Sequence, residues 1–180
     1  MRTKPGGPVD PLVELARRSL AWFVSTGRVI EAAPEDLLVQ IPPGPAACFV
    51  SLHEIRGKLR GCMGTLEAGE PSLAQEILHN AVAACSRDRR FPPVRPEELA
   101  GLQIGVDVLS PLEPIPGPEH LDPRRFGVVV ETPNGRRGVL LPDLEGVDTV
   151  ERQLVVVCRK AGIRPGERYL LHRFTVERHR

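Results

Sequence analysis

Apolar side chains recur every three to four residues in the segment 11–26, which is the spacing of an amphipathic helix. Asp10 precedes this segment and Pro11 opens it, and both residue types are favoured at a helix start. Gly27 marks the expected end, because glycine is common just after the last helical turn. The sequence therefore predicts a first helix that packs one face on a core.

Two further segments have the same spacing. In the segment 73–85 the apolar residues fill one half of the predicted helix, and Glu76 and Asn80 fall on the polar half. Near the end of the chain, Asp148 is expected to open a last helix that Gly162 ends. Both segments are expected to cover a sheet.

Short apolar runs between these segments predict strands. The runs 46–52 and 58–67 are expected to pair as a hairpin, and the alternating run 102–110 is expected to add a strand. The segment 169–178 reads as one closing strand.

The segment 126–143 gives the clearest hairpin signal. Two apolar runs flank Asn134 and Gly135, a dipeptide that supplies the positive φ values of a tight turn. The segment 111–123 before it is rich in proline and is expected to be a stiff connector without regular structure.

The order of these elements predicts the fold class. Helices and strands are mixed, and the strands are joined mostly by turns, which favours an α+β fold in two lobes built on mainly antiparallel sheets with flanking helices. We expect residues 1–9 to be a flexible N-terminus and residues 10–180 to form a single domain in two lobes. The connector near 111–123 would mark the boundary between them.

Composition and charge narrow the class of protein. With 180 residues, of which 41% are hydrophobic and 26% charged, the chain can bury a core of its own. A net charge of +1 argues against an electrostatic nucleic-acid binder. The 19 prolines suit a heat-adapted source, although a GC-rich genome gives a similar composition.

The four cysteines are scattered singly, which favours neither a zinc site nor a secreted disulfide framework. The chain begins without an apolar leader segment, so we expect a cytoplasmic protein without a membrane anchor. No phosphate loop or metal motif is present, and we expect no cofactor and no metal.

The stretch KLRGCMGTLE, residues 58–67, carries the strongest candidate chemistry. Residues two apart in a strand share a face, so Arg60 is expected beside Cys62, where its charge would stabilise a thiolate by roughly 0.6–2.4 kcal/mol at about 7 Å. Gly61 and Gly64 would then leave room for a ligand. The alternative is that the cysteine is a small core residue and that the glycines allow close packing.

A thiol enzyme also needs a base near its nucleophile. His53 lies just before the motif and could fold back over it, and His79 lies on the polar side of the predicted helix. No histidine stands out, which favours a binding role. Arginine pairs could bind phosphate or an acidic partner, or could simply be a solvated surface: Arg89–Arg90, Arg124–Arg125 and Arg136–Arg137.

Taken in order, several stretches of the chain resemble the AMMECR family, also called AmmeMemoRadiSam system protein A. These stretches are FVSLHEIRGKLRGCMGTLE, AVAACSRDRRFPPVRPEEL, IGVDVLSPLEPI, GVVVETPNGRRGVLLPD and CRKAGI, and the match spans roughly residues 10–178. The chain departs from the family pattern at Met63, where isoleucine is usual, and at Arg89, where proline is usual. The tryptophan often found after KAG is missing, with Tyr169 as a candidate substitute.

The resemblance implies a two-lobed α+β fold and a functional surface lined by the LRGCMG segment. Carried over by position, the surface residues are Leu59, Arg60, Gly61, Cys62, Gly64, Arg90, Phe91, Pro92 and Pro93. It also implies that Memo-like and radical-SAM proteins are partners, and it supplies no activity.

Three hypotheses follow. The favoured one is an accessory or binding module that uses the LRGCMG surface. The second is a thiol-dependent enzyme with Cys62 as nucleophile and His53 or His79 as base. The third is nucleic-acid binding through the arginine pairs.

Overall fold

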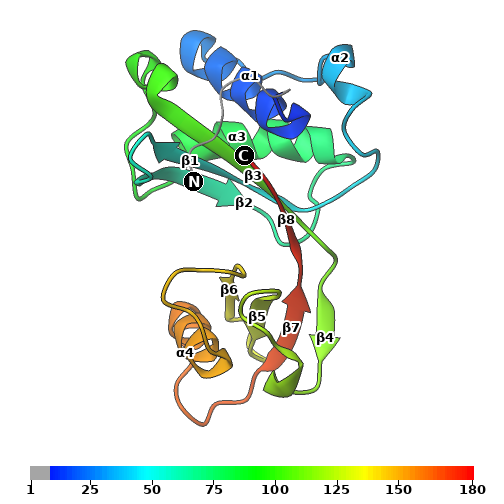
Figure 1. Cartoon of the computed structure of the whole chain (residues 1–180), viewed down its shortest axis with the longest axis vertical. Helices are drawn as coiled ribbons and strands as arrows, with labels where there is room; N and C mark the ends of the chain where they lie inside the picture. The colour runs from blue at the N-terminus through cyan, green and yellow to red at the C-terminus, as the bar shows by residue number, and fades with distance from the viewer. Residues whose placement is uncertain (1–8) are drawn as a thin grey trace. The chain divides into compact units, whose positions relative to one another are not determined.

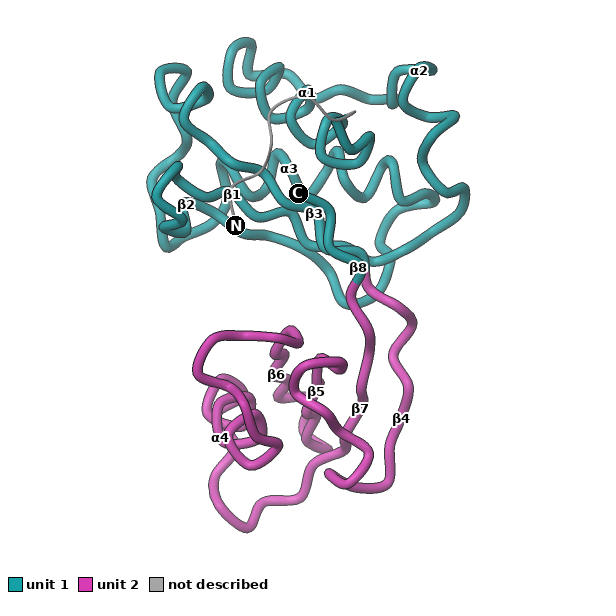
Figure 2. The backbone as a smooth tube through the Cα atoms, viewed as in Figure 1, with its two compact units in different colours: residues 1–108, 177–180 teal, residues 109–176 magenta. Residues whose placement is uncertain are grey.

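The computed structural model describes residues 9–180, so the flexible N-terminus expected over residues 1–9 falls almost entirely outside the described residues. The chain divides into two compact units (Figure 2). Unit 1 runs up to Val108 and includes residues 177–180, and unit 2 contains residues 109–176. Each unit combines helices with an antiparallel sheet, which confirms the predicted α+β fold class.

Unit 1 is a four-stranded sheet in the order β2-β1-β3-β8, with helix α3 against β1 and β2 and helix α1 against α3 (Figure 1). Strand β1 is antiparallel to both of its neighbours. The elements are α1 (Pro11–Thr26), α2 (Glu35–Leu38), β1 (Cys48–Glu54), β2 (Leu59–Gly64), α3 (Leu73–Ser86), the 3-10 helix η1 (Pro96–Gly101), β3 (Leu102–Leu109) and β8 (Val176–His179).

Helix α1 begins and ends where the sequence predicted. The Asp10 carboxylate accepts a hydrogen bond from the Leu12 N–H at 2.9 Å, and Gly27 closes the helix with a φ of 71°. Leu15 and Ala16 are fully buried on the inner face. These local capping signals are therefore enough to set both helix ends.

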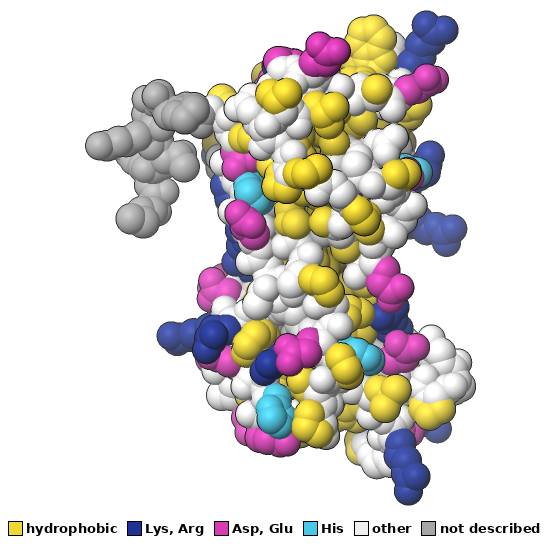
Figure 3. All heavy atoms as spheres, turned by 90° about the vertical axis from the view of Figure 1, so that its right-hand side faces the viewer, with side chains coloured by type: hydrophobic (Ala, Val, Ile, Leu, Met, Phe, Trp, Pro, Cys, Tyr) yellow, Lys and Arg dark blue, Asp and Glu magenta, His cyan; other side chains and the backbone are white. Residues whose placement is uncertain are grey.

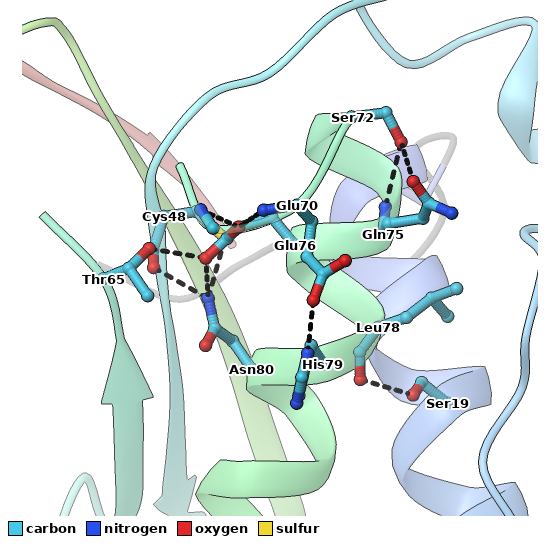
Figure 4. A network of polar contacts seen from close by, with 11 residues as sticks. Ser19, Cys48, Thr65, Glu70, Ser72, Gln75, Glu76, Leu78, His79 and Asn80 are labelled. Carbon is cyan, nitrogen blue, oxygen red and sulfur yellow. Dashed lines mark hydrogen bonds and ion pairs between the residues drawn. The ribbon is translucent and has the colours of Figure 1, made fainter. Parts of the chain in front are cut away.

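Helix α3 differs from the prediction because it is buried on nearly every side, between the sheet and α1. Glu76 and Asn80, expected on a polar half, are only 2% and 6% exposed. Glu76 accepts hydrogen bonds from the backbone N–H groups of Gly69 and Glu70 at 2.9 and 3.0 Å, and Asn80 donates to the Cys48 carbonyl at 3.1 Å (Figure 4). Glu76 therefore fixes the loop before α3 and Asn80 ties α3 to β1, and neither side chain meets solvent.

Unit 2 is a second four-stranded sheet, in the order β4-β7-β5-β6, with helix α4 packed on β5 and β6 (Figure 1). Its core includes Val128, Val130 and Val157, all fully buried. The elements are β4 (Glu113–Ile115), the 3-10 helix η2 (Pro118–His120), β5 (Gly127–Glu131), β6 (Arg137–Leu140), α4 (Val150–Ala161) and β7 (Leu170–Phe174).

The connector expected to lack regular structure, 111–123, contains both β4 and η2. Strand β4 lies at the edge of its sheet and has β7 as its neighbour in the strand order. In this pairing Pro114 lies opposite His172. An edge position tolerates proline because the missing N–H would face away from the ladder. The expected lack of regular structure is therefore wrong for this segment, because it contains an edge strand.

Two details of unit 2 also differ from the prediction, the start of α4 and the β5–β6 turn. Thr149, not Asp148, caps α4, because its hydroxyl accepts from the Arg152 N–H at 3.2 Å. Of the Asn134–Gly135 dipeptide only the glycine has a positive φ, 82°, so the β5–β6 turn is not of the type predicted.

The closing strand expected over 169–178 is two strands in different sheets, β7 in unit 2 and β8 in unit 1. The break lies at Thr175. Its N–H donates to the Ser110 hydroxyl at 2.9 Å, and its carbonyl accepts from the Ser110 N–H at 3.0 Å.

Across residues 9–180, no helix has both the length and the apolar character needed to cross a bilayer.

Candidate functional site

Arg60, in the LRGCMG strand, anchors the segment that follows α3. Its Nε and one Nη donate to the two carboxylate oxygens of Glu98 at 2.7 and 3.0 Å, and the other Nη donates to the Pro92 carbonyl at 2.9 Å. The Arg60 side chain is only 10% exposed, and its hydrogen bonds lower the pKa of Glu98. Arg60 therefore ties β2 to the 92–98 segment through a two-pronged ion pair.

This geometry gives Arg60 a different role from the one that strand alternation predicted. The register of β1 against β2 shifts between Leu52 and His53, so a bulge interrupts the alternation at Arg60. The guanidinium is matched by the Glu98 carboxylate. The charge of a different arginine, Arg90, interacts with Cys62.

Both glycines of the motif allow close packing. A Cβ at Gly61 would overlap the carbonyl oxygen of Ala84 in α3, and a Cβ at Gly64 would overlap the Cys48 carbonyl and the Phe49 ring. Glycine at these positions therefore lets α3 and β1 approach the strand. Of the two interpretations left open by the sequence, the structure supports close packing for the glycines.

Cys62 is half-buried, and its backbone is held by a buried carboxylate. The Cys62 N–H donates to the Asp88 carboxylate at 2.9 Å, and Arg90 donates to the same carboxylate through Nε at 2.9 Å and Nη at 2.7 Å. The Arg90 hydrogen bonds hold the pKa of Asp88 well below its usual range. These bonds, with the charges of Asp88 and Cys62, raise the pKa of Arg90, although burial opposes them.

The Cys62 side chain lies on the sheet face opposite α3. Gly61 faces α3, so the next residue points to the other side. Cys62 pairs with Ser51 in β1, and Ser51 pairs with Gly105 in β3. We call this side the outer sheet face, and its residues include Ser51, His53, Cys62, Gly105 and Asp107.

Titratable side chains gather on the outer sheet face. The Arg180 guanidinium donates to the buried Asp107 carboxylate at 2.9 Å. Burial, and then the positive charge of Arg180, lower the pKa of His53. His53 is the diagonal neighbour of Cys62 across the β1–β2 pair, which corresponds to roughly 7–8 Å between Cα atoms. The outer sheet face therefore combines a thiol with a neutral imidazole.

His79 lies on the other side of the sheet, on α3. Its Nδ1 is 2.7 Å from a Glu70 carboxylate oxygen (Figure 4), and both side chains line a small pocket of about 180 Å³ with Leu78 and Val82. Of the two bases predicted from the sequence, the structure brings His53 and not His79 to the face that carries Cys62.

The segment after α3 presents an exposed surface beside Cys62. The Arg90 guanidinium lies 5.4 Å from the centre of the Phe91 ring, and one Nη contacts the Cys62 carbonyl at 3.4 Å. Pro92 and Pro93 are exposed, while their carbonyls face Arg60. We call Cys62, Arg90, Phe91, Pro92 and Pro93 the motif surface.

Within residues 9–180, three of the six arginines in the arginine pairs form ion pairs. Arg90, Arg136 and Arg137 each form an ion pair with a carboxylate, and Arg125 stacks over the Phe126 ring at 5.3 Å. On the face drawn in Figure 3, positive and negative side chains are interspersed. Among the described residues, that face shows no continuous basic patch (Figure 3).

Sequence reasoning missed the two acidic residues that organise the site, Asp88 and Glu98. Glu98 carried a recognisable signal, because it lies three residues after Arg95 and its carboxylate accepts from the Arg95 N–H at 2.8 Å, as at a helix start. Asp88 gave no such signal, since its partner Cys62 is distant in sequence. Within residues 9–180 there is no cluster of three or more His, Cys, Asp or Glu side chains suited to a metal ion.

Comparisons with known proteins identify a family model, several relatives and a solved structure of similar fold. The model of the AMMECR1 family matches residues 13–179. A Thermotoga maritima protein is 47% identical over 174 residues, covering 94% of this chain and 97% of its own length. A Clostridium acetobutylicum protein is 42% identical over 171 residues, which cover 95% of this chain and only 36% of that longer protein. The crystal structure of the uncharacterized protein PH0010 from Pyrococcus horikoshii superposes with a TM-score of 0.83 at 33% identity, covering 93% of this chain and 88% of PH0010.

Proposed function

The chain belongs to the AMMECR1 family, and from that premise we propose that it is an accessory protein that binds a protein partner through the motif surface. One observation carries the proposal. Gly61 and Gly64 allow α3 and β1 to pack against the strand. Arg60 binds the carbonyls of Pro92 and Pro93, so the motif supports the adjoining Arg90–Pro93 segment.

The chemistry of the motif surface suits protein recognition. Arginine and aromatic side chains are enriched among the residues that dominate binding energy at interfaces. Here Arg90 and Phe91 stack on each other, and two prolines beside them fix the backbone at low entropic cost. The segment is therefore preorganised before a partner arrives.

The partner classes that we propose are the Memo-like and radical-SAM proteins of the same cytoplasm. The family resemblance motivates them. In the Clostridium relative the matched region is 36% of a longer chain, so a region like this one is joined there to further sequence.

One substitution distinguishes the proposed binding role from a catalytic role of Cys62. Cys62→Ser changes one atom of the motif surface and leaves its backbone hydrogen bond to Asp88 intact. We expect the variant to keep its affinity for the purified Memo-like protein and to support the cellular function. A variant that binds normally but abolishes that function would overturn the accessory role in favour of thiol chemistry.

The second candidate function is a thiol-dependent enzyme with Cys62 as nucleophile and His53 as base. The observation that favours it is their shared position on the outer sheet face, with the pKa of His53 lowered so that the imidazole can accept a proton at neutral pH. It predicts that His53→Gln and Cys62→Ser give the same loss of function.

Nucleic-acid binding through the arginine pairs has the least support, because Arg90, Arg136 and Arg137 already bind carboxylates. It would require an affinity for nucleic acid that falls steeply with salt.

A further inference from the structure

Unit 2 contains a pocket that the proposed function does not use. Its volume is about 380 Å³, and it lies between the last turns of α4 and the loop that leads to β7. This volume is within the range of small-molecule sites. Apolar or uncharged residues form most of the lining: Leu154, Val155, Cys158, Ile163, Pro165 and Tyr169.

Cys158 and Tyr169 contribute uncharged polar groups to the pocket lining, and burial raises the pKa of both groups. Val155, which lines the pocket, leaves 53% of its surface exposed. An apolar ligand would cover this surface.

The charged residues that line the pocket are both arginines, Arg159 and Arg164. Arg159 has no ion pair among residues 9–180. The carboxylate near Arg164 is that of Glu167, which is bound by Arg136; this bond and the charges of Arg136 and Arg164 lower the pKa of Glu167. Positive charge at the pocket is therefore incompletely matched by the protein.

The C-terminus of α4 carries partial negative charge, and three carbonyls there accept hydrogen bonds. The Gly162 N–H donates to the Arg159 carbonyl at 3.1 Å, and the Ile163 N–H donates to the Cys158 carbonyl at 2.9 Å. Arg136 donates to the Gly162 carbonyl. These donors partly offset the negative charge at this end of the helix.

We propose that this pocket binds an amphipathic anion, a ligand with an apolar chain or ring and a carboxylate or phosphate head. The apolar part lies against Leu154, Val155 and Ile163, and the head is held by Arg159 and Arg164, whose guanidinium groups match the geometry of both anions. This site is independent of the motif surface, which belongs to unit 1.

Calorimetric titration of the full chain with decanoate and with decyl phosphate, below their micelle-forming concentrations, tests the proposal. Decanol is the uncharged control ligand. We expect the anions to bind and decanol to bind at least about 10-fold more weakly, as expected for the loss of one charge-assisted contact. Whichever of the two anions binds with the higher affinity shows which head group the pocket prefers.

The double variant Arg159→Gln/Arg164→Gln removes the charges and keeps most of the side-chain volume. The double variant should bind both anions about 10-fold or more weakly than the wild type. The matched control is Arg152→Gln, which changes an exposed arginine of α4 outside the pocket and should bind the anions as the wild type does. Equal urea midpoints for the three proteins would show that unit 2 is folded in each.

Alkylation locates the bound ligand. Saturating decanoate should slow the modification of Cys158 by iodoacetamide and leave the rate at Cys62, in unit 1, unchanged. The proposal is overturned if decanol binds as tightly as decanoate, if the double variant binds as the wild type does, or if Cys158 is not protected.

Discussion

Replacing Arg60 with methionine should destabilise unit 1 by several kcal/mol. The substitution keeps the aliphatic stem and removes the guanidinium that joins β2 to the segment after α3. Four hydrogen bonds are lost, two to Glu98 at 2.7 and 3.0 Å and two to the carbonyls of Pro92 and Pro93 at 2.9 and 3.4 Å. No other side chain of the motif makes these bonds.

The size of the expected change in the free energy of unfolding follows from the burial of the Arg60–Glu98 ion pair. Removing one partner of a buried ion pair costs about 3–5 kcal/mol, because the remaining charge is left without its partner. The Glu98 side chain is 31% exposed and regains part of its hydration, which reduces the cost. We therefore expect the free energy of unfolding to fall by about 2–4 kcal/mol.

Urea titration followed by fluorescence measures this change, because the chain has one tryptophan, Trp22, and it lies in unit 1. The control is Arg89→Met, an exposed arginine in the same segment, for which the urea midpoint should not move. A loss below about 0.5 kcal/mol for Arg60→Met, the size of an ordinary surface substitution, would refute the anchoring role of Arg60.

Three further predictions concern the same unit. Gly61→Ala should lower the free energy of unfolding by about 1–3 kcal/mol in urea titration, because the added methyl overlaps a carbonyl of α3; a neutral effect would contradict the packing role. The pKa values of Asp88 and Glu98 are depressed in the folded state, so their stabilisation is complete above about pH 4–5 and should be lost as the pH falls through the folded values; a urea midpoint constant from pH 6 to pH 2 would disagree. Burial raises the pKa of Cys48 to about 12 and that of Cys85 to about 11, so alkylation at pH 7 should reach them only after unfolding, as mass spectrometry can show.

Local signals account for the parts of the fold that the sequence predicted. Asp10 and Gly27 define α1 through bonds to residues within one turn, so their positions in the sequence are sufficient. The edge strand β4 was missed because proline content alone does not reveal that a strand has a neighbour on one side only.

The candidate site depended on contacts that sequence spacing does not show. Strand alternation placed Arg60 beside Cys62, but the bulge interrupts the alternation and Arg60 binds Glu98, 38 residues away. Arg90 and Asp88 meet Cys62 only because the chain turns back along β2 after α3. The segments that resemble the family were found from the sequence, and the way in which they contact each other was not.

The most direct test of the accessory role is the affinity of this protein for the purified Memo-like protein of the same organism. Isothermal titration would compare the wild type with Phe91→Ser, in the motif surface, and with Trp22→Ser, an exposed aromatic residue of α1. The proposed function predicts that Phe91→Ser weakens binding by about 10-fold or more while Trp22→Ser leaves it unchanged. Wild-type affinity in the Phe91→Ser variant would contradict it.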